Sequence, residues 1–592
     1  MQVIAHPDDD ILFMNPDLAA WIQAGLPTVS VYLTSGESDL SRGVYYAASR
    51  QRGTRAAYAA MAGVPNEWTS YELAIDKRHS VELYRLKGRP DIRLVWVNLP
   101  DDNNPNATGG RHALTRLWDD STGHLRVQTI VPADGAVPEQ YSYTRAGVIG
   151  MLTALLKRFQ PTVIRSQDPS PDARYQHVWQ RFHDHPDHVV TARFAREAAQ
   201  RYFTAGTDHR AVVLSYRDYN VAQAPVNLSP SARKLTRKYF AVYAEHDSEV
   251  SLGAPYDAWI ARSYYRWPRG GSWLVADDKG RLHAFTRVGY ELLHWTRDSA
   301  GWSKPVRVRA EFDSPLWPSL ALTAAGESVA VFATAGSPAR VRVFMAGQWR
   351  DLGSPGSQPA ATAAAQLGAP SAVGKPGGGS MVFVRNEAGG ISMRSVSKGQ
   401  VSQGWRVLGG QDVQGRPTVL RDDQGRIHVF ATTTGSVLHW TQSTSGAPLR
   451  PAPNPLPGVR PASQPAVALG TDGTPVVAVR VARTGELAVS KHRSGAWEDP
   501  ALLPPPGGLG TPELVVTTHP VLFVRNGEGT VSVARGTPDG FTGWTALDGK
   551  ILDHPAAAVT PRGITLAGLG PAGRLLVNAQ HGGAFTGWQP VG

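Results

Sequence analysis

The first part of the chain alternates short apolar runs with longer segments whose apolar residues recur every three or four positions. The runs have the length of buried strands, and the periodic segments have the spacing of amphipathic helices. Strands are expected at residues 2–5, 29–33, 94–97, 162–164 and 212–214. Helices are expected at residues 12–24, 45–62, 144–159 and 189–202. This alternation predicts a Rossmann-like α/β domain with a mostly parallel sheet.

Helical periodicity ends near Trp267, and a repeat follows it. Residues 277–285 recur almost unchanged as residues 422–430, which is 145 positions later. Weaker copies place an apolar residue at the corresponding point every 44–51 positions, at Phe285, Phe332, Phe383, Phe430, Ala478, Phe523 and Ala567. Seven units of this length, each with several short strand signals, predict an all-β propeller with seven blades. The expected domains are therefore residues 1–262 and 268–592.

Most of these units close with a glycine and a tryptophan. The tryptophans are Trp302, Trp349, Trp405, Trp497, Trp544 and Trp588. One interpretation is structural, because a large ring fills the wedge between neighbouring blades. The alternative is a surface that stacks on sugar rings, and the sequence leaves it open.

Composition excludes several kinds of chemistry. The chain of 592 residues has no cysteine, so disulfides, thiolate metal sites and a cysteine nucleophile are all absent. The net charge of +11 comes from scattered basic residues without a dense run, and we expect no nucleic-acid partner. No apolar stretch reaches the ~20 residues that a membrane-spanning helix needs.

Two clusters stand far apart in the predicted α/β domain. Residues 6–9 (His-Pro-Asp-Asp) follow the first strand, and residues 185–188 (His-Pro-Asp-His) begin the last predicted helix. Side chains that follow strands of such a sheet gather at one edge, so the clusters can meet. A catalytic zinc ion needs about three protein ligands and an open position for water. Metal-assisted hydrolysis is the chemistry that these residue types favour.

Spacing suggests a division of roles within the two clusters. His6 and Asp9 can point at one metal ion, and His188 can supply a third ligand. Asp8 then projects beside the metal, as a general base requires. His185 can face the reacting carbonyl group. Taken alone, each cluster could equally be a turn or a helix start.

The two motifs resemble the signatures of the PIG-L/LmbE deacetylases, which are zinc-dependent enzymes acting on N-acetylglucosamine-containing and related substrates. The resemblance covers about the first 250 residues, and it implies that Zn²⁺ or another divalent metal is held by His6, Asp9 and His188. It further implies that Asp8 is the general base, that His185 stabilises the oxyanion or acts as an acid, and that Asp187 orients a histidine. Substrate contacts are implied for Asp101 and for one of Arg50 and Arg52.

The resemblance is incomplete at one position, because Asp10 stands where the family usually has glutamate. The expected activity is removal of an N-acetyl group from an amino sugar or glycoconjugate, with the propeller as a glycan-binding module. The alternatives are a zinc amidohydrolase for another acylated amine and an inactive glycan-binding protein. We expect a secreted or cell-surface location, with the bacterial cytoplasm as the alternative. The oligomeric state is left open.

Overall fold

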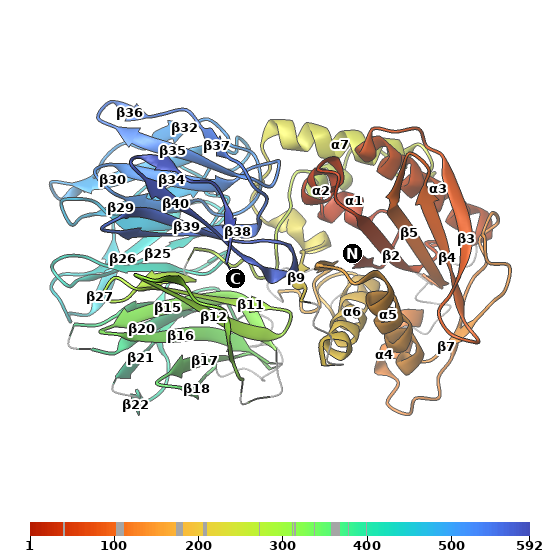
Figure 1. The fold of residues 1–592 in the computed structure, drawn as a ribbon, viewed down its shortest axis with the longest axis horizontal. Helices are drawn as coiled ribbons and strands as arrows, with labels where there is room; N and C mark the ends of the chain where they lie inside the picture. Colours follow the sequence, from red (N-terminus) through yellow and green to blue (C-terminus); the bar gives the residue numbers. More distant parts are fainter. Residues whose placement is uncertain are drawn as a thin grey trace. The chain divides into compact units, whose positions relative to one another are not determined.

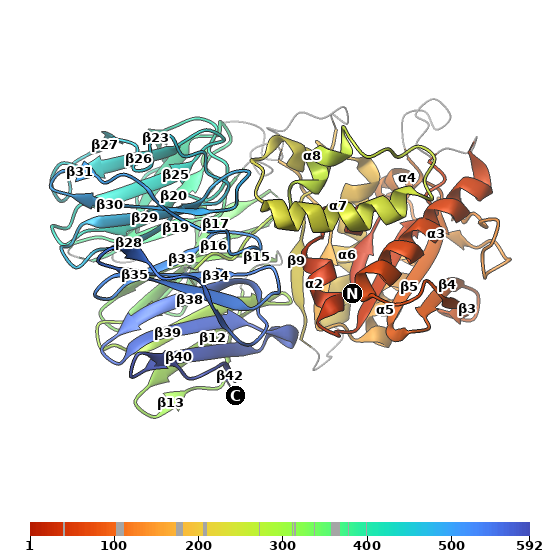
Figure 2. The same ribbon diagram turned by 90° about the horizontal axis from the view of Figure 1, so that it is seen from above.

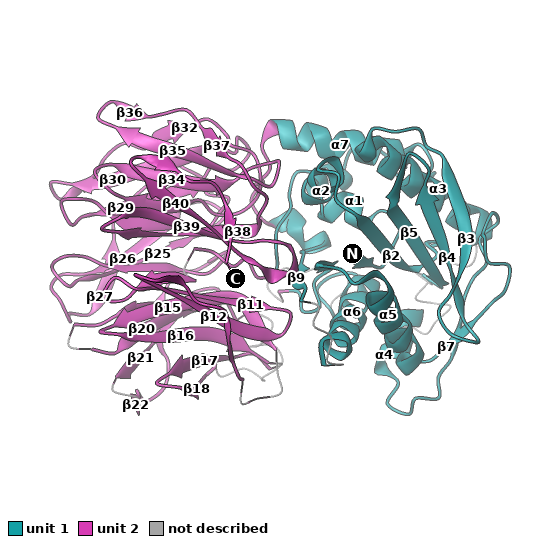
Figure 3. Ribbon diagram, in the orientation of Figure 1, with its two compact units in different colours: residues 1–171, 175–223, 231–266 teal, residues 172–174, 224–230, 267–592 magenta. Residues whose placement is uncertain are grey.

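The computed structural model describes residues 1–38, 42–101, 112–172, 181–204, 210–271, 273–310, 312, 315–336, 338–356, 367–376, 378–397 and 400–591. The chain divides into two compact units (Figure 3). Unit 1 comprises residues 1–171, 175–223 and 231–266, and unit 2 comprises residues 172–174, 224–230 and 267–592. The division after residue 266 falls between the two predicted domains, but two short segments inside 1–262 are grouped with unit 2.

Unit 1 is a layered α/β domain built on one twisted sheet. Over the described residues its strand order is β3 (Trp68–Ala74), β4 (Ser80–Leu86), β5 (Arg89–Leu99), β2 (Thr28–Thr34), β1 (Gln2–Ile4), β8 (Val163–Ser166) and β9 (Val212–Ser215). From β5 to β9 all neighbours are parallel, whereas β4 is antiparallel to both β3 and β5. The predicted parallel sheet is therefore present, with an antiparallel extension that the apolar pattern did not indicate. A separate small pair consists of β6 (Val127–Gln128) and β7 (Ser142–Tyr143).

Helices cover both faces of this sheet (Figures 1 and 2). One face carries α2 (Asp17–Gln23), α3 (Gly43–Ala62) and α7 (Pro230–Ala244), and the other carries α4 (Ala113–Asp119), α5 (Arg145–Phe159) and α6 (Pro186–Thr204). The remaining helical segments are α1 (Asp9–Phe13), the 3-10 turn η1 (Tyr219–Gln223) and α8 (Tyr256–Ile260). No described helix has the length and apolar character that crossing a membrane requires.

The predicted helix over residues 12–24 is two helices, α1 and α2. Pro16 lacks a backbone N–H and cannot continue the hydrogen bonding of α1, so the chain turns there before α2 begins. The other three predicted helices correspond to α3, α5 and α6. The Thr144 side chain accepts a hydrogen bond from Gly147 N at 3.1 Å and caps α5.

Unit 2 is a seven-bladed β-propeller, counted over the part of the chain that the structure describes. Blade 1 consists of β10 (Leu274–Ala276), β11 (Leu282–Val288), β12 (Glu291–Asp298), β13 (Gly301–Trp302) and β14 (Val306–Val308). Blade 2 consists of β15 (Leu316–Ala325), β16 (Ser328–Ala335), β17 (Arg340–Met345) and β18 (Gln348–Gly353). Blade 3 consists of β19 (Ser371–Gly374), β20 (Ser380–Arg385), β21 (Ile391–Ser397), β22 (Gln400–Val401) and β23 (Arg406–Gly409). Blade 4 consists of β24 (Thr418–Arg421), β25 (Ile427–Thr432), β26 (Val437–Gln442) and β27 (Leu449–Ala452).

The last three blades have the same plan. Blade 5 consists of β28 (Ala466–Leu469), β29 (Pro475–Arg480), β30 (Leu487–Arg493), β31 (Ala496–Trp497) and β32 (Ala501–Leu503). Blade 6 consists of β33 (Glu513–Val516), β34 (Pro520–Arg525), β35 (Val531–Thr537), β36 (Gly540–Phe541) and β37 (Thr545–Leu547). Blade 7 consists of β38 (Leu552–Thr560), β39 (Gly563–Leu569), the 3-10 turn η2 (Pro571–Gly573), β40 (Leu575–His581), β41 (Ala584–Phe585) and β42 (Gln589–Pro590). Each described blade contains only strands that are consecutive in sequence.

The apolar core of the propeller lies between blades. Six clusters of buried side chains each join residues of two neighbouring blades, as where Phe332 and Val341 of blade 2 meet Val382 of blade 3. The ring closes between blades 1 and 7, where Arg269 Nη1 lies 3.3 Å from Asp553 Oδ2 and both residues are buried. The inner strands β25, β29 and β34 are buried at every position, because each lies between two neighbouring blades.

The recurring tryptophans also contact neighbouring blades. Three of them donate a hydrogen bond from Nε1, at 2.8 Å, to a carbonyl group in or just after the last strand of the preceding blade. The pairs are Trp349 with Arg309, Trp405 with Leu352, and Trp544 with Pro504. All six tryptophan side chains are half-buried. These contacts support the structural interpretation of the repeated residue.

Blades 1 and 4 share a buried polar ladder at matching positions. In blade 1, Asp277 Oδ2 lies 3.3 Å from His283 Nε2, and His283 Nδ1 lies 3.1 Å from His294 Nε2. In blade 4 the equivalent distances are 3.2 and 3.1 Å and involve Asp422, His428 and His439. The near-identical segments found in the sequence therefore form near-identical networks.

Candidate metal centre

The first cluster is held in the loop between β1 and α1. Thr34 N donates a hydrogen bond to Ala5 O at 3.0 Å, and Thr54 Oγ1 donates one to Pro7 O at 2.6 Å. Gly36 packs against the ring of Pro7, and a Cβ atom at Gly36 would lie 2.5 Å from Pro7 Cγ. Gly36 also has a φ of +79°, so a side chain there is excluded both by backbone conformation and by space. These contacts fix the direction of the side chains that follow.

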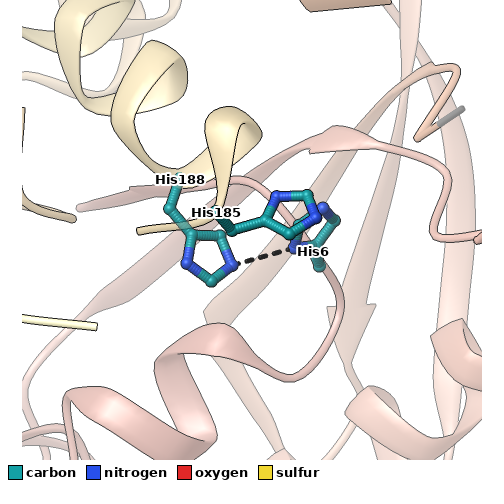
Figure 4. Close-up of side chains that lie close together, drawn as sticks. All are labelled: His6, His185 and His188. Atoms are coloured by element: carbon teal, nitrogen blue, oxygen red, sulfur yellow. Dashed lines mark hydrogen bonds between the residues drawn. The ribbon is translucent and has the colours of Figure 1, made fainter. Parts of the chain in front are cut away.

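The structure brings His6, Asp9 and His188 together at the end of β1 and the start of α6. His6 Nδ1 lies 3.1 Å from His188 Nε2 (Figure 4). Asp9 Oδ1 lies 3.0 Å from His188 Nε2, and Asp9 Oδ2 lies 3.3 Å from His6 Nδ1. All three side chains are buried. Asp9 is held in turn by the backbone N–H of His6 at 2.7 Å and by Gln167 Nε2 at 3.0 Å.

The spacing of these donor atoms fits a small divalent cation. Zinc–nitrogen bonds of about 2.05 Å place tetrahedral ligand atoms about 3.3 Å apart, close to the separations within this group. Two imidazole nitrogens that face each other beside a carboxylate form a donor set typical of zinc. Buried histidine and aspartate groups that could hold a metal recur around the same point, and one of them joins His6, His185 and His188.

Electrostatic coupling within the group is strong. Burial opposes ionisation of Asp9, but His188 and His6 hold its pKa well below the usual range. Burial also lowers the pKa of His188, yet Asp9 and Asp184 raise it to about 10. The same competition raises the pKa of His6 well above its ordinary value, chiefly through Asp101 and Asp9. Because a bound cation would replace these protons, metal affinity should rise with pH.

Asp8 lies beside the group and pairs with Arg50 of α3. Arg50 Nη2 donates to Asp8 Oδ1 at 2.9 Å. Arg50 Nε donates to Tyr243 Oη at 2.8 Å and lies 3.0 Å from Asp247 Oδ2. Burial raises the pKa of Asp8 to about 6, and the Arg50 charge limits that rise. A carboxylate whose pKa lies near neutrality is suited to accepting a proton.

The two candidate arginines have different environments. Only 10% of the Arg50 side chain is exposed, against 46% for Arg52. Arg52 points to Asp134, with Nη1 and Oδ2 3.0 Å apart. Residues two apart on a helix differ in direction by about 200°, so only one of them can face the cluster. Arg50 lies at the candidate metal centre, and Arg52 does not.

A second set of polar groups surrounds the other nitrogen of His6. His6 Nε2 lies 3.3 Å from Asp101 Oδ1 and 3.5 Å from Asp187 Oδ2. His112 Nδ1 lies 3.6 Å from the same oxygen of Asp187. Among the described residues, His6 Nε2, Asp101 Oδ1 and both Asp187 oxygens have no hydrogen-bond partner. The His185 ring lies among them, with its centroid 4.8 Å from that of His6 and 5.0 Å from that of His112.

Asp10 is directed toward the sheet. It is fully buried and accepts hydrogen bonds from Tyr32 Oη, at 3.0 Å, and from Tyr58 Oη. Burial raises its pKa to about 7, and the two hydroxyl groups oppose that rise. The departure from the family's glutamate therefore lies at a contact between α1, β2 and α3, where the shorter side chain meets two tyrosines.

Several residues of the site were not assigned from the sequence. Asp184 contacts His188, and Asp247 contacts Arg50. His112 lies beside Asp187. His112 and Asp247 lie outside the two motifs, and Asp184 directly precedes the second one. In the sequence, none of the three differs from an ordinary polar residue. Their roles depend on contacts across the fold.

Comparison with protein families gives a match for the first third of the chain. Residues 1–199 match the family PIG-L, described as GlcNAc-PI de-N-acetylase. A comparison with curated proteins finds no match.

Solved structures show a distant likeness to this chain. AofleA from Arthrobotrys oligospora has 12% identity and a TM-score of 0.33, with 55% of this chain and 87% of that one covered. A mutant Aleuria aurantia lectin in complex with Fucα1-6GlcNAc has 13% identity and a TM-score of 0.31, with 45% and 91% covered. A mutant NanB sialidase from Streptococcus pneumoniae has 11% identity and a TM-score of 0.30, with 55% and 67% covered. At these values the likenesses carry no conclusion about ligands.

Proposed function

Taking the N-terminal domain as a PIG-L domain, we propose that this protein is a zinc-dependent hydrolase that removes an N-acetyl group from an amino sugar or glycoconjugate. The observation that carries the proposal is the convergence of His6, Asp9 and His188 beside Asp8 in the domain that matches the family. The match supports the reaction type, and the identity of the sugar is part of the proposal.

In this proposal, His6, Asp9 and His188 would hold the metal ion, which when bound would lower the pKa of a water molecule and polarise the substrate carbonyl group. Asp8 accepts the proton of the attacking water. Arg50 holds the Asp8 carboxylate in place through the 2.9 Å hydrogen bond. The developing negative charge is stabilised by His185, which then supplies a proton to the departing amine.

Asp101 and Asp187 complete the site in this proposal. Both carboxylates lie within 3.5 Å of His6 Nε2, so they fix the orientation of the ring whose other nitrogen faces the metal position. The Asp101 Oδ1 atom, which has no hydrogen-bond partner among the described residues, is suited to accepting a hydrogen bond from a sugar hydroxyl group. Arg52 takes no part, because its side chain lies at Asp134.

The contribution of the propeller stays a prediction. Three of the recurring tryptophans use their Nε1 atoms between blades, which supports a structural role for the repeat. Glycan binding by the propeller and a secreted or cell-surface location are proposed on the pairing of a propeller with a glycan-directed hydrolase. Binding of the full chain to immobilised N-acetylated polysaccharide, measured with and without competing sugar, tests the first of these.

Acetate release from N-acetylated sugars and glycans tests the enzymatic proposal. We expect release that stops on chelation and returns with added Zn²⁺. Asp8→Asn should reduce turnover by at least about 100-fold while stoichiometric metal remains bound. Asp120→Asn, an exposed carboxylate bonded to Thr122 and Leu125, is the control that should keep full activity.

Three outcomes would contradict parts of this proposal. Full activity of Asp8→Asn refutes the assignment of the base. Amine release from other acyl amides, without acetate release from sugars, indicates the alternative amidohydrolase. A wild-type chain that binds no metal and releases no acetate supports the inactive glycan-binding alternative.

A further inference from the structure

Asp184 is a fully buried carboxylate that the proposed reaction does not use. It directly precedes His185, and its Oδ1 accepts a hydrogen bond from His185 N at 2.8 Å. The same oxygen lies 3.3 Å from Nδ1 of His188. His188 Nε2 faces Asp9 and His6, so the two nitrogens of this ring face different carboxylates.

The Asp184 carboxylate also reaches η1, which follows β9. Oδ1 accepts a hydrogen bond from Tyr219 N at 3.3 Å, and Oδ2 accepts one from Asn220 N at 3.0 Å. The Tyr219 ring lies 4.7 Å from the His188 ring, and Trp259 stacks on Tyr219 with centroids 4.4 Å apart. One buried side chain therefore connects the start of α6 to the aromatic residues that pack against His188.

We propose that Asp184 is the positioning residue of His188. Accepting the proton on Nδ1 leaves Nε2 unprotonated on the side of Asp9 and His6, where the metal is proposed to bind. The other tautomer would place a proton on the nitrogen that faces the other two donors. By holding η1 as well, Asp184 keeps Tyr219 against the ring and limits its rotation. This inference rests on the proposed metal site and adds a residue outside the proposed ligand set.

Metal affinity is the readout that tests this role. Zinc affinity of the full chain is measured by competition with a chelator, for the wild type and for Asp184→Asn. We expect the variant to bind about 10–100-fold more weakly, as is usual when the partner of a ligating histidine is lost. The cobalt-substituted variant should also show a changed visible spectrum, because the orientation of one ligand has changed.

Asp168→Asn is the matched control. Asp168 is also fully buried in unit 1, but its carboxylate contacts Ser170 N at 2.8 Å and Arg266 Nε at 3.1 Å. Loss of that carboxylate should reduce thermal stability and leave zinc affinity and the cobalt spectrum unchanged. If Asp184→Asn behaves in the same way, Asp184 has only a structural role and the proposal is overturned.

A measurement on the wild type guards against a variant that fails to fold. Nitrogen-15 NMR of ring-labelled histidines should show His188 protonated at Nδ1 in the metal-loaded chain, with the signal assigned by its loss in His188→Gln. A proton on Nε2 overturns the proposal. A wild type that binds zinc tightly but releases no acetate refutes the proposed deacetylase function alone, and one that binds no zinc overturns both.

Discussion

Replacing Arg50 with glutamine removes the positive charge that faces three buried carboxylates. The guanidinium group lies 2.9 Å from Asp8, 3.0 Å from Asp247 and 3.7 Å from Asp101. Glutamine retains polarity and much of the volume, but it leaves these acids without a counter-charge. The matched change is Arg52→Gln, two positions along α3, where the pair with Asp134 is exposed on both sides.

The structure gives very different magnitudes for the two changes. Removing one partner of a buried ion pair costs about 3–5 kcal/mol, because the remaining charge stays desolvated. In a domain of this size each kcal/mol lowers the melting temperature by about 2–4 °C, so Arg50→Gln should lower that of unit 1 by about 10 °C. An exposed pair contributes about 0–1 kcal/mol, so Arg52→Gln should lower the melting temperature by at most about 4 °C.

Differential scanning calorimetry of the full chain, metal-free, measures both variants. Domain-selective proteolysis identifies the transition that belongs to unit 1. The reasoning is refuted if the two variants lower that transition equally, since the environments of Arg50 and Arg52 would then not differ as described. A second check is a double-mutant cycle with Asp8→Asn. Adding Asp8→Asn to Arg50→Gln should restore part of the lost melting temperature, because it removes one of the buried negative charges that Arg50 had faced.

Two further predictions concern the propeller. Trp405→Phe keeps an aromatic ring but replaces the indole with a smaller phenyl group and removes the hydrogen bond to Leu352 O, so unit 2 should lose at least about 1 kcal/mol in denaturant unfolding. An unchanged midpoint would show that the bond contributes nothing. Burial and a neighbouring histidine lower the pKa of His294 to about 4 and that of His439 to about 3. The unfolded chain therefore takes up protons below about pH 6.5 that the folded blades do not, so the melting temperature of unit 2 should fall as pH drops from 6.5 toward 4. Replacing both histidines with glutamine should flatten that slope, and an unaltered slope would contradict the assignment.

The sequence predicted those features that depend on local pattern. Continuous apolar runs located β2, β8 and β9, and helical periodicity located α3, α5 and α6. The recurrence of residues 277–285 revealed the propeller, because a repeating unit must bury the same positions each time. By contrast, β3 has few buried positions and carried no clear apolar signal, so the antiparallel end of the sheet was missed.

The site was predictable only as far as its motifs. His6, Asp9 and His188 could be singled out because zinc takes histidine and carboxylate ligands, and the two motifs hold such residues in short, recognisable runs; the structure places the three side chains together. The choice between Arg50 and Arg52 needed the rotation of α3 relative to the site. Asp184 looks in the sequence like any acidic residue before a helix, and its contacts with His188 and η1 become visible only in the folded chain.

The order of strands in the propeller has a consequence for how this chain arose. Since every described blade is one uninterrupted stretch, a blade can be gained or lost as a single segment without rethreading its neighbours. Blades 1 and 4 share their Asp-His-His ladder and lie three blades apart. Copying of a block of three blades would place two matching ladders at this spacing.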